Sequence, residues 1–99
     1  MLMHVQFPME PFNTYVKDGS AGQKIKKIME AIRPEVAYFT EQHGQRGATL
    51  AIDMKDSSEI PKFAEPFFLT FNALVEFRVA MTPEDLGRAN LEEHGKKWA

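Results

Sequence analysis

Apolar and polar residues alternate along several stretches of the chain, and a period of two is the pattern of β-strands with one buried face. In residues 2–9, every second residue from Met3 to Phe7 is apolar. Residues 73–81 alternate in the same way. Residues 36–54 hold two such runs joined by a short turn, which predicts a β-hairpin. The pattern therefore predicts four strands.

Between the first two strands, apolar residues recur every three or four positions, which predicts an amphipathic helix. Ser20 and Gln23 have the spacing of a capping box at its start, and Pro34 stops it. A short helical segment at 12–18 precedes it, and we expect an interruption at Gly19–Gly22. The apolar stripe consists of Ile25, Ile28, Met29 and Ile32.

A second amphipathic helix follows the hairpin. We expect Ser58 to cap it, because Pro61 has no N–H and must lie in the first turn, and Asn72 to end it. Pro66 lies inside the segment and predicts a kink or break, since an interior proline costs about 3 kcal/mol. The buried side holds Ile60, Phe63, Ala64, Phe67, Phe68 and Phe71.

The C-terminal residues predict one further helix. Thr82 is its expected cap, Pro83 takes the first helical position, and acidic residues fill the first turn. Gly87 and Gly95 weaken this helix, and we expect Trp98 to dock against the rest of the protein.

The elements follow one another as strand, helix, strand, strand, helix, strand and an extra helix. This order predicts a ferredoxin-like α+β fold as a single domain over residues 1–99, because the chain is too short for a second core. Right-handed crossovers give an antiparallel sheet with strand order 4-1-3-2. Within the hairpin, we expect Gln42 opposite Gly47, with His43–Arg46 as a four-residue loop.

The predicted sheet has its two main helices on one side, which leaves a second face uncovered. That face is too apolar to lie comfortably in water, and another copy of the same sheet is the economical cover, since two-fold homodimers are the commonest assemblies. Two sheets packed about 10 Å apart could enclose a small cavity. The second face is expected to carry Leu2, His4, Gln6, Val36, Tyr38, Thr40, Thr49, Ala51, Asp53, Leu74, Glu76 and Arg78.

Several short motifs carry a resemblance to known families, namely YFTE, RGATLAIDM, EPFFL, NAxVEF and MTPEDL. Over residues 38–86 the chain resembles a bacterial family of small ferredoxin-like proteins with no assigned activity. The element order, length and half-polar sheet face resemble the dimeric α+β barrel superfamily, which includes muconolactone isomerases and small antibiotic-biosynthesis monooxygenases. The resemblance implies a homodimer. It implies no catalytic residue, because no catalytic motif matches residue by residue.

Six polar residues of the second face are candidate ligand-binding residues. A histidine near carboxylates suits proton transfer around neutral pH, and two charged residues two positions apart on one strand, with ~6.5–7 Å between α-carbons, can pair. The same groups could instead form salt bridges that fix the register of a dimer. Tyrosine and threonine could orient a ligand, although strands favour both types. The candidates are His4, Tyr38, Thr40, Asp53, Glu76 and Arg78.

Composition narrows the chemistry. The chain has no cysteine, which excludes disulfides, thiolate metal sites and a thiol nucleophile. His4, His43 and His94 lack the spacing of metal ligands, so we expect neither a metal nor another cofactor. A net charge of −2, and the absence of aromatics from the open side of the first and third strands, argue against nucleic-acid binding.

The N-terminal sequence MLMHVQFP lacks the features of a signal peptide, and no stretch is long and apolar enough for a bilayer, so we expect a cytoplasmic protein with no membrane partner. Two function classes remain open. The protein could bind, or act on, a small metabolite in a cavity on the sheet face. Alternatively, it could be a non-catalytic interaction module whose polar sheet face only forms the dimer interface.

Overall fold

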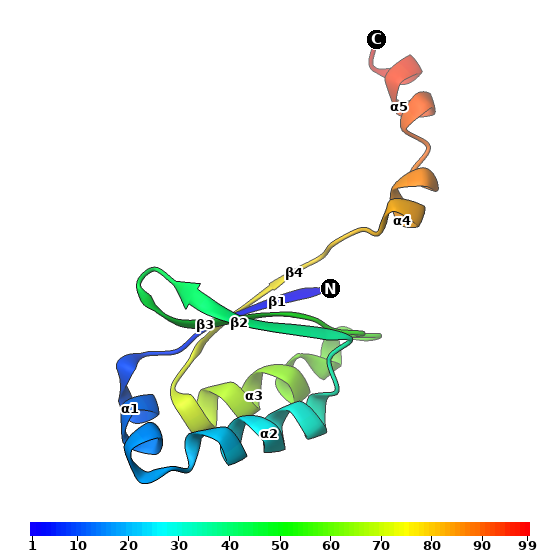
Figure 1. Ribbon diagram of the computed structural model, residues 1–99. Helices are drawn as coiled ribbons and strands as arrows, with labels where there is room; N and C mark the ends of the chain where they lie inside the picture. Colours follow the sequence, from blue (N-terminus) through cyan, green and yellow to red (C-terminus); the bar gives the residue numbers. More distant parts are fainter.

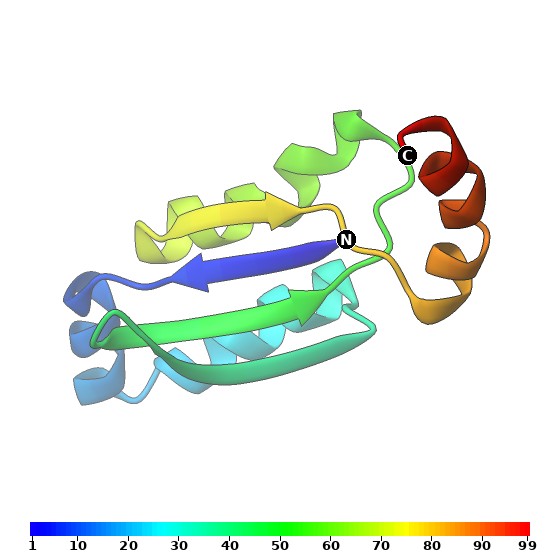
Figure 2. The same cartoon turned by 90° about the horizontal axis from the view of Figure 1, so that it is seen from above.

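Four strands pair into one antiparallel sheet in the computed structural model, which describes the whole chain, residues 1–99. The sheet order is β2-β3-β1-β4, which confirms the predicted α+β class and strand order (Figure 2). The strands are β1 (Leu2–Gln6), β2 (Val36–Gln42), β3 (Gln45–Ala51) and β4 (Leu74–Arg78).

Three helices lie on one side of this sheet, with α2 and α3 along it and α1 at one end (Figure 1). They are α1 (Met9–Asp18), α2 (Ala21–Ile32) and α3 (Ile60–Phe71), and a 3₁₀ turn, η1 (Ser57–Glu59), leads into α3. Gly19 ends α1 with a left-handed φ of 83°, which confirms the predicted interruption between the first two helices.

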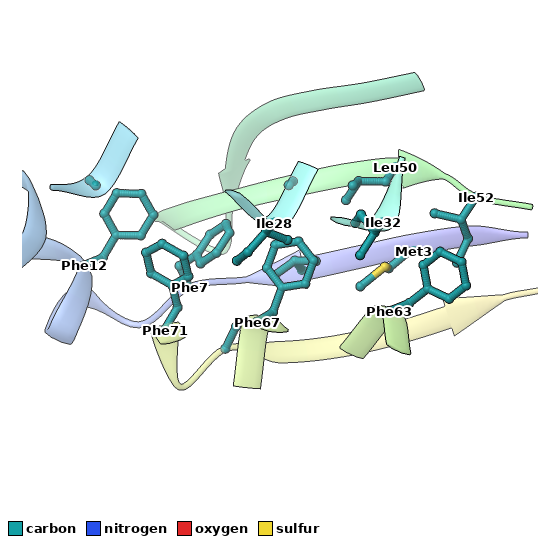
Figure 3. Close-up of a cluster of buried hydrophobic side chains, with 14 residues drawn as sticks. Met3, Phe7, Phe12, Ile28, Ile32, Leu50, Ile52, Phe63, Phe67 and Phe71 are labelled. Atoms are coloured by element: carbon teal, nitrogen blue, oxygen red, sulfur yellow. The ribbon is translucent and has the colours of Figure 1, made fainter. Parts of the chain in front are cut away.

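The core lies between the sheet and the helices, as Figure 3 shows. Phe7 is at its centre, and its ring packs edge-on against the rings of Phe12, Phe67 and Phe71 with centroids 5.1, 6.0 and 5.1 Å apart. The alternation seen in the sequence accounts for this arrangement, because every second residue of β1 faces α2 and α3.

The hairpin turn is tighter than predicted. Gln42 pairs with Gln45, which leaves His43–Gly44 as a two-residue loop with φ of 53° and 76°. Positive φ at both positions is typical of a type I′ turn, which matches the twist of the flanking strands. The expected pairing of Gln42 with Gly47 is therefore wrong by two residues. A shift of two leaves every side chain on its predicted face, so the core is unaffected.

Ser20 precedes the first residue of α2, Ala21, as predicted, but two of the predicted side-chain caps are wrong. Ser20 already has a helical backbone, with φ −92° and ψ −10°, so its side chain makes no hydrogen bond and the capping box with Gln23 does not form. Before α3, the carboxylate of Asp56 accepts the N–H of Ser58 at 3.3 Å, so Asp56 is the capping residue and Ser58 lies inside the 3₁₀ turn.

The break predicted at Pro66 does not occur, and α3 is one continuous helix that ends, as predicted, at Asn72. The buried side chains of Phe63, Phe67 and Phe71 flank the proline and hold both halves of the helix against the sheet. Burying each phenylalanine contributes about 1.5–3 kcal/mol, and together they outweigh the roughly 3 kcal/mol that an interior proline costs.

Residues 79–99, which we call the arm, project from the end of β4 (Figure 1). Its helices are α4 (Pro83–Gly87) and α5 (Leu91–Lys97), so the single C-terminal helix predicted from the sequence is divided after Gly87. The predicted start at Thr82 is confirmed: its hydroxyl accepts the N–H of Asp85, whose carboxylate accepts the N–H of Thr82, both at 3.1 Å.

The arm gives the chain an elongated shape. The principal dimensions are 60, 27 and 19 Å, and the radius of gyration is 17.1 Å, whereas a compact chain of this length has about 13 Å. Trp98 does not dock within the single chain and is 76% exposed. None of the helices is long and apolar enough to cross a membrane.

Candidate functional site

The side of the sheet away from the helices is uncovered, and strand pairing arranges its outward positions in three rows that cross all four strands, with the pair Gln42 and Gln45 beyond them on the hairpin. We call this surface the open face. Residues directly opposite on paired strands point to the same side, so each row can be read across the sheet from β2 to β4. The rows are Val36, Ala51, Leu2 and Arg78; Tyr38, Thr49, His4 and Glu76; and Thr40, Gly47, Gln6 and Leu74.

The middle row, which we call the polar row, consists of Tyr38, Thr49, His4 and Glu76. Neighbours in such a row have Cβ atoms about 4.5–5.5 Å apart, so one small ligand could contact all four side chains. His4 Nδ1 lies 3.2 Å from Thr49 Oγ1. Glu76, directly opposite His4, forms no salt bridge within the chain. The polar row thus places a phenol, a hydroxyl, an imidazole and a free carboxylate side by side.

Arg78 lies one row away from Glu76 on the same strand, and both side chains are exposed. They do not pair with each other in the single chain, and Arg78 forms no other salt bridge. A guanidinium without a counter-ion at the margin of the open face can receive a carboxylate from a ligand or from another protein chain.

Asp53 does not join the other candidates. The sequence-based register placed it opposite Val36, but Ala51 occupies that position and β3 ends there. The carboxylate of Asp53 instead pairs with Lys55, with Nζ and Oδ2 3.1 Å apart and both side chains exposed. The error in the hairpin turn therefore also produced the error at Asp53.

The other predicted site residues do not all lie in one row either. The structure brings His4, Tyr38 and Glu76 together in one row, while Thr40 lies in the next row opposite Gly47. Thr49 was not among the predicted site residues, although it is the hydrogen-bonding neighbour of His4. The tight His43–Gly44 turn is the signal that would have identified it, because that turn fixes which residue of β3 faces Tyr38.

A recess of about 400 Å³ lies between the hairpin and the helices, and Arg46 is one of the residues that line it. Arg46 was expected in a loop, but it belongs to β3. Its guanidinium lies 4.5 Å from the ring centroid of Phe12 and donates a hydrogen bond to Asn13 Oδ1 at 2.8 Å. These contacts tie α1 to the sheet. The recess is lined by Phe7, Phe12, Ile25, Phe39, Thr40, Arg46 and Gly47.

A larger recess, of about 560 Å³, lies between α4 and α5 in the arm. Neither recess includes a residue of the polar row. No group of three histidine or acidic side chains is arranged to hold a metal ion. No family model matches the chain, and a comparison with curated proteins finds no match.

Proposed function

We propose that the protein is a homodimer of the dimeric α+β barrel type that binds a small metabolite between its open faces, with the polar row at the centre of the site. One observation carries this proposal. His4 and Glu76 lie side by side, with Thr49 as the only hydrogen-bonding partner of the histidine side chain, in the middle of a sheet face that no helix covers.

The composition of the open face supports the homodimer. An antiparallel sheet with one face in water normally presents polar residues there, yet Val36, Tyr38 and Leu74 are large apolar or aromatic side chains exposed by 45%, 66% and 65%. A second open face packed about 10 Å away would remove these side chains from water. A two-fold axis parallel to the strands would also place the polar row of one copy opposite that of the other.

The arrangement of side chains indicates the class of ligand. Hydrogen-bonding groups occupy the middle row, and apolar side chains such as Leu2 and Leu74 lie in the rows on either side. Binding sites for small molecules combine mostly apolar walls with a few placed polar groups. We therefore propose a metabolite with a compact apolar body and one or two polar groups, one of them a carboxylate that reaches Arg78.

The unpaired charges of β4 favour a second candidate function. Glu76 and Arg78 have no partner within the chain. A two-fold axis perpendicular to the strands and parallel to the sheets would instead place β4 over β4, so that each of the two residues could pair with the other's counterpart in a second copy. Such an interface would be closed by its own salt bridges and would leave no room for a ligand. The protein would then be a non-catalytic interaction module.

Thermal unfolding with a metabolite library distinguishes the two functions. A ligand at a hundred times its Kd stabilises the protein by about 2.7 kcal/mol, which raises Tm by roughly 10–20 °C in a domain of this size. We expect His4→Ala and Arg78→Ala to fold normally and to lose this shift. Lys27→Ala, on an exposed position of α2, should keep it. All four proteins are compared at one concentration, because the Tm of a dimer depends on it.

A library without any stabilising compound, or an unchanged shift in both open-face variants, would favour the interaction module. Light scattering on the wild-type protein gives the association state independently. A monomer at all accessible concentrations would contradict both functions.

A further inference from the structure

We infer that the arm of each copy packs against the other copy of the homodimer, beginning beside Val36 at the margin of its open face. This inference rests on the homodimer proposed above and names the part of the partner that completes it. None of the large apolar residues of the arm belongs to the core or packs against it.

The arm cannot be stable by itself. α4 has five residues and α5 has seven, whereas isolated helices shorter than about 12–15 residues are marginal in water. Helices of this length persist when an apolar side packs against another surface. The large apolar residues of the arm are between 45% and 83% exposed, and they are Val79, Met81, Leu86, Leu91 and Trp98.

The chain's own body is poorly placed to cover the arm. The first row of the open face runs from Val36 on β2 to Arg78 on β4, so the exposed Val36 is three strand spacings, about 14 Å, from the start of the arm. Residues 79–82 contain no glycine, and Thr82 is extended with φ −77° and ψ 167°, so no tight turn brings the arm back.

The arm instead points to where a second copy would lie. Figure 2 shows it beyond the ends of the strands, and Figure 1 shows it rising on the side of the sheet opposite α2 and α3. A second open face packed on the first would occupy this same side, about 10 Å above the sheet. The arm therefore overhangs the end of the space that the partner fills.

Strand order makes the contact specific. A two-fold axis parallel to the strands and between the two sheets places β4 of one copy over β2 of the other and keeps positions along the strands. Arg78 and Val36 belong to the same row, so Arg78 of one copy lies over Val36 of the partner subunit. The first residues of the arm, Val79 to Met81, then emerge beside that valine.

The size of the resulting interface is that of a stable dimer. Standard protein interfaces contain about 20–30 residues a side. The three rows of the open face supply twelve positions and the pair Gln42 and Gln45 adds two, which still falls short of this range. The arm adds residues 79–99, and the part of it that meets the partner brings each side into the range.

Cross-linking tests the inference, because the chain has no cysteine and any introduced thiol is unique. Met81→Cys and Val36→Cys alter exposed side chains, so both variants should fold. The two proteins are mixed, allowed to exchange subunits and treated with a short bismaleimide. We expect a product of two chains on a denaturing gel. Lys17→Cys, on the exposed side of α1, should give none with Met81→Cys.

A chain with both substitutions, Met81→Cys and Val36→Cys, shows whether the arm packs against the second copy or folds back on its own chain. We expect a two-chain product that disappears when the protein is diluted below its dimer Kd before treatment. A product within one chain that persists on dilution would overturn the inference. A dimer by light scattering that gives no cross-link, or that links only Met81→Cys to Met81→Cys, would overturn it as well and leave the homodimer standing. A monomer would overturn both.

Discussion

The body of the protein, residues 1–78, and the arm, residues 79–99, are stabilised in different ways. In the body, Phe67 and Phe71 are completely buried, and the strands hold one another through a continuous ladder of backbone hydrogen bonds. In the arm, the capping box at Thr82 is formed, yet Trp98 is 76% exposed. The arm thus has the local signals of helices without the burial that normally accompanies them.

The difference shows that helix capping and burial of apolar side chains contribute unequally to the two regions of the chain. A helix cap contributes about 1 kcal/mol, whereas each large apolar side chain that becomes buried contributes about 1.5–3 kcal/mol. The body has both contributions, so we expect it to unfold as one cooperative unit. The arm has only the first, so its helices gain most of their stability when another surface covers them.

The largest effect is expected from removing burial in the body. Phe67→Ala should lower the free energy of unfolding by about 3–5 kcal/mol, because it deletes a completely buried ring and leaves a cavity between α3 and the sheet. Urea unfolding followed by circular dichroism measures the change. Phe68→Ala, at the neighbouring position that is 39% exposed, is the matched control and should cost much less. Equal losses would mean that the core is not packed as described.

A smaller effect is expected at the end of the arm, and it should concern association instead of folding. Trp98→Ala should weaken the proposed dimer by about 2 kcal/mol, or roughly thirtyfold in Kd, because tryptophan is a frequent hot-spot residue of interfaces. Sedimentation equilibrium measures Kd, and Lys97→Ala is the neighbouring control. An unchanged Kd, together with a lowered free energy of unfolding at concentrations where the protein is monomeric, would show that Trp98 packs against the body of its own chain.

The smallest effect is expected from the same substitution, glycine to alanine, made once in the body and once in the arm. Gly22→Ala in α2 and Gly95→Ala in α5 each place a methyl group where nothing lies within 4 Å. Alanine raises the stability of a helix over glycine by about 0.4–1 kcal/mol. We expect this gain in the urea unfolding of the body for Gly22→Ala alone. Gly95→Ala should change only the helical content of the arm, and a matching gain in unfolding would show that both regions unfold together.

The order of strands and helices in the body could be predicted from the sequence. Apolar residues recur every second position in the strands and every three or four positions in the helices, and the two patterns do not overlap. Pairing within the hairpin could not be predicted, because a shift of two residues keeps every side chain on the same face and so leaves burial unchanged. The candidate site inherits this ambiguity. His4 and Glu76 were placed correctly through β1 and β4, whereas Asp53 depended on the hairpin and was misplaced.

The arm shows a different limit of sequence reasoning. Thr82 and Pro83 marked the start of a helix correctly, since capping depends on atoms only a few residues apart. The docking of Trp98 depends on surfaces elsewhere, and no pattern within residues 79–99 specifies which surface that is. The same holds for Pro66, whose effect on α3 was decided by the burial of three phenylalanines against the sheet.

The short extended segment between Arg78 and Pro83 has a consequence for the lifetime of the proposed homodimer. Exposed backbone outside helices and sheets is where proteases preferentially cut. Cleavage after Arg78 would detach the arm and leave every buried side chain in the body, because the last residue of the core is Ala73. A single peptide bond thus separates a self-contained domain from the segment that would join two copies. In the proposed homodimer, hydrolysis of that bond would remove the arm's contacts with the partner without unfolding either chain, and would leave the open faces alone to hold the two copies together.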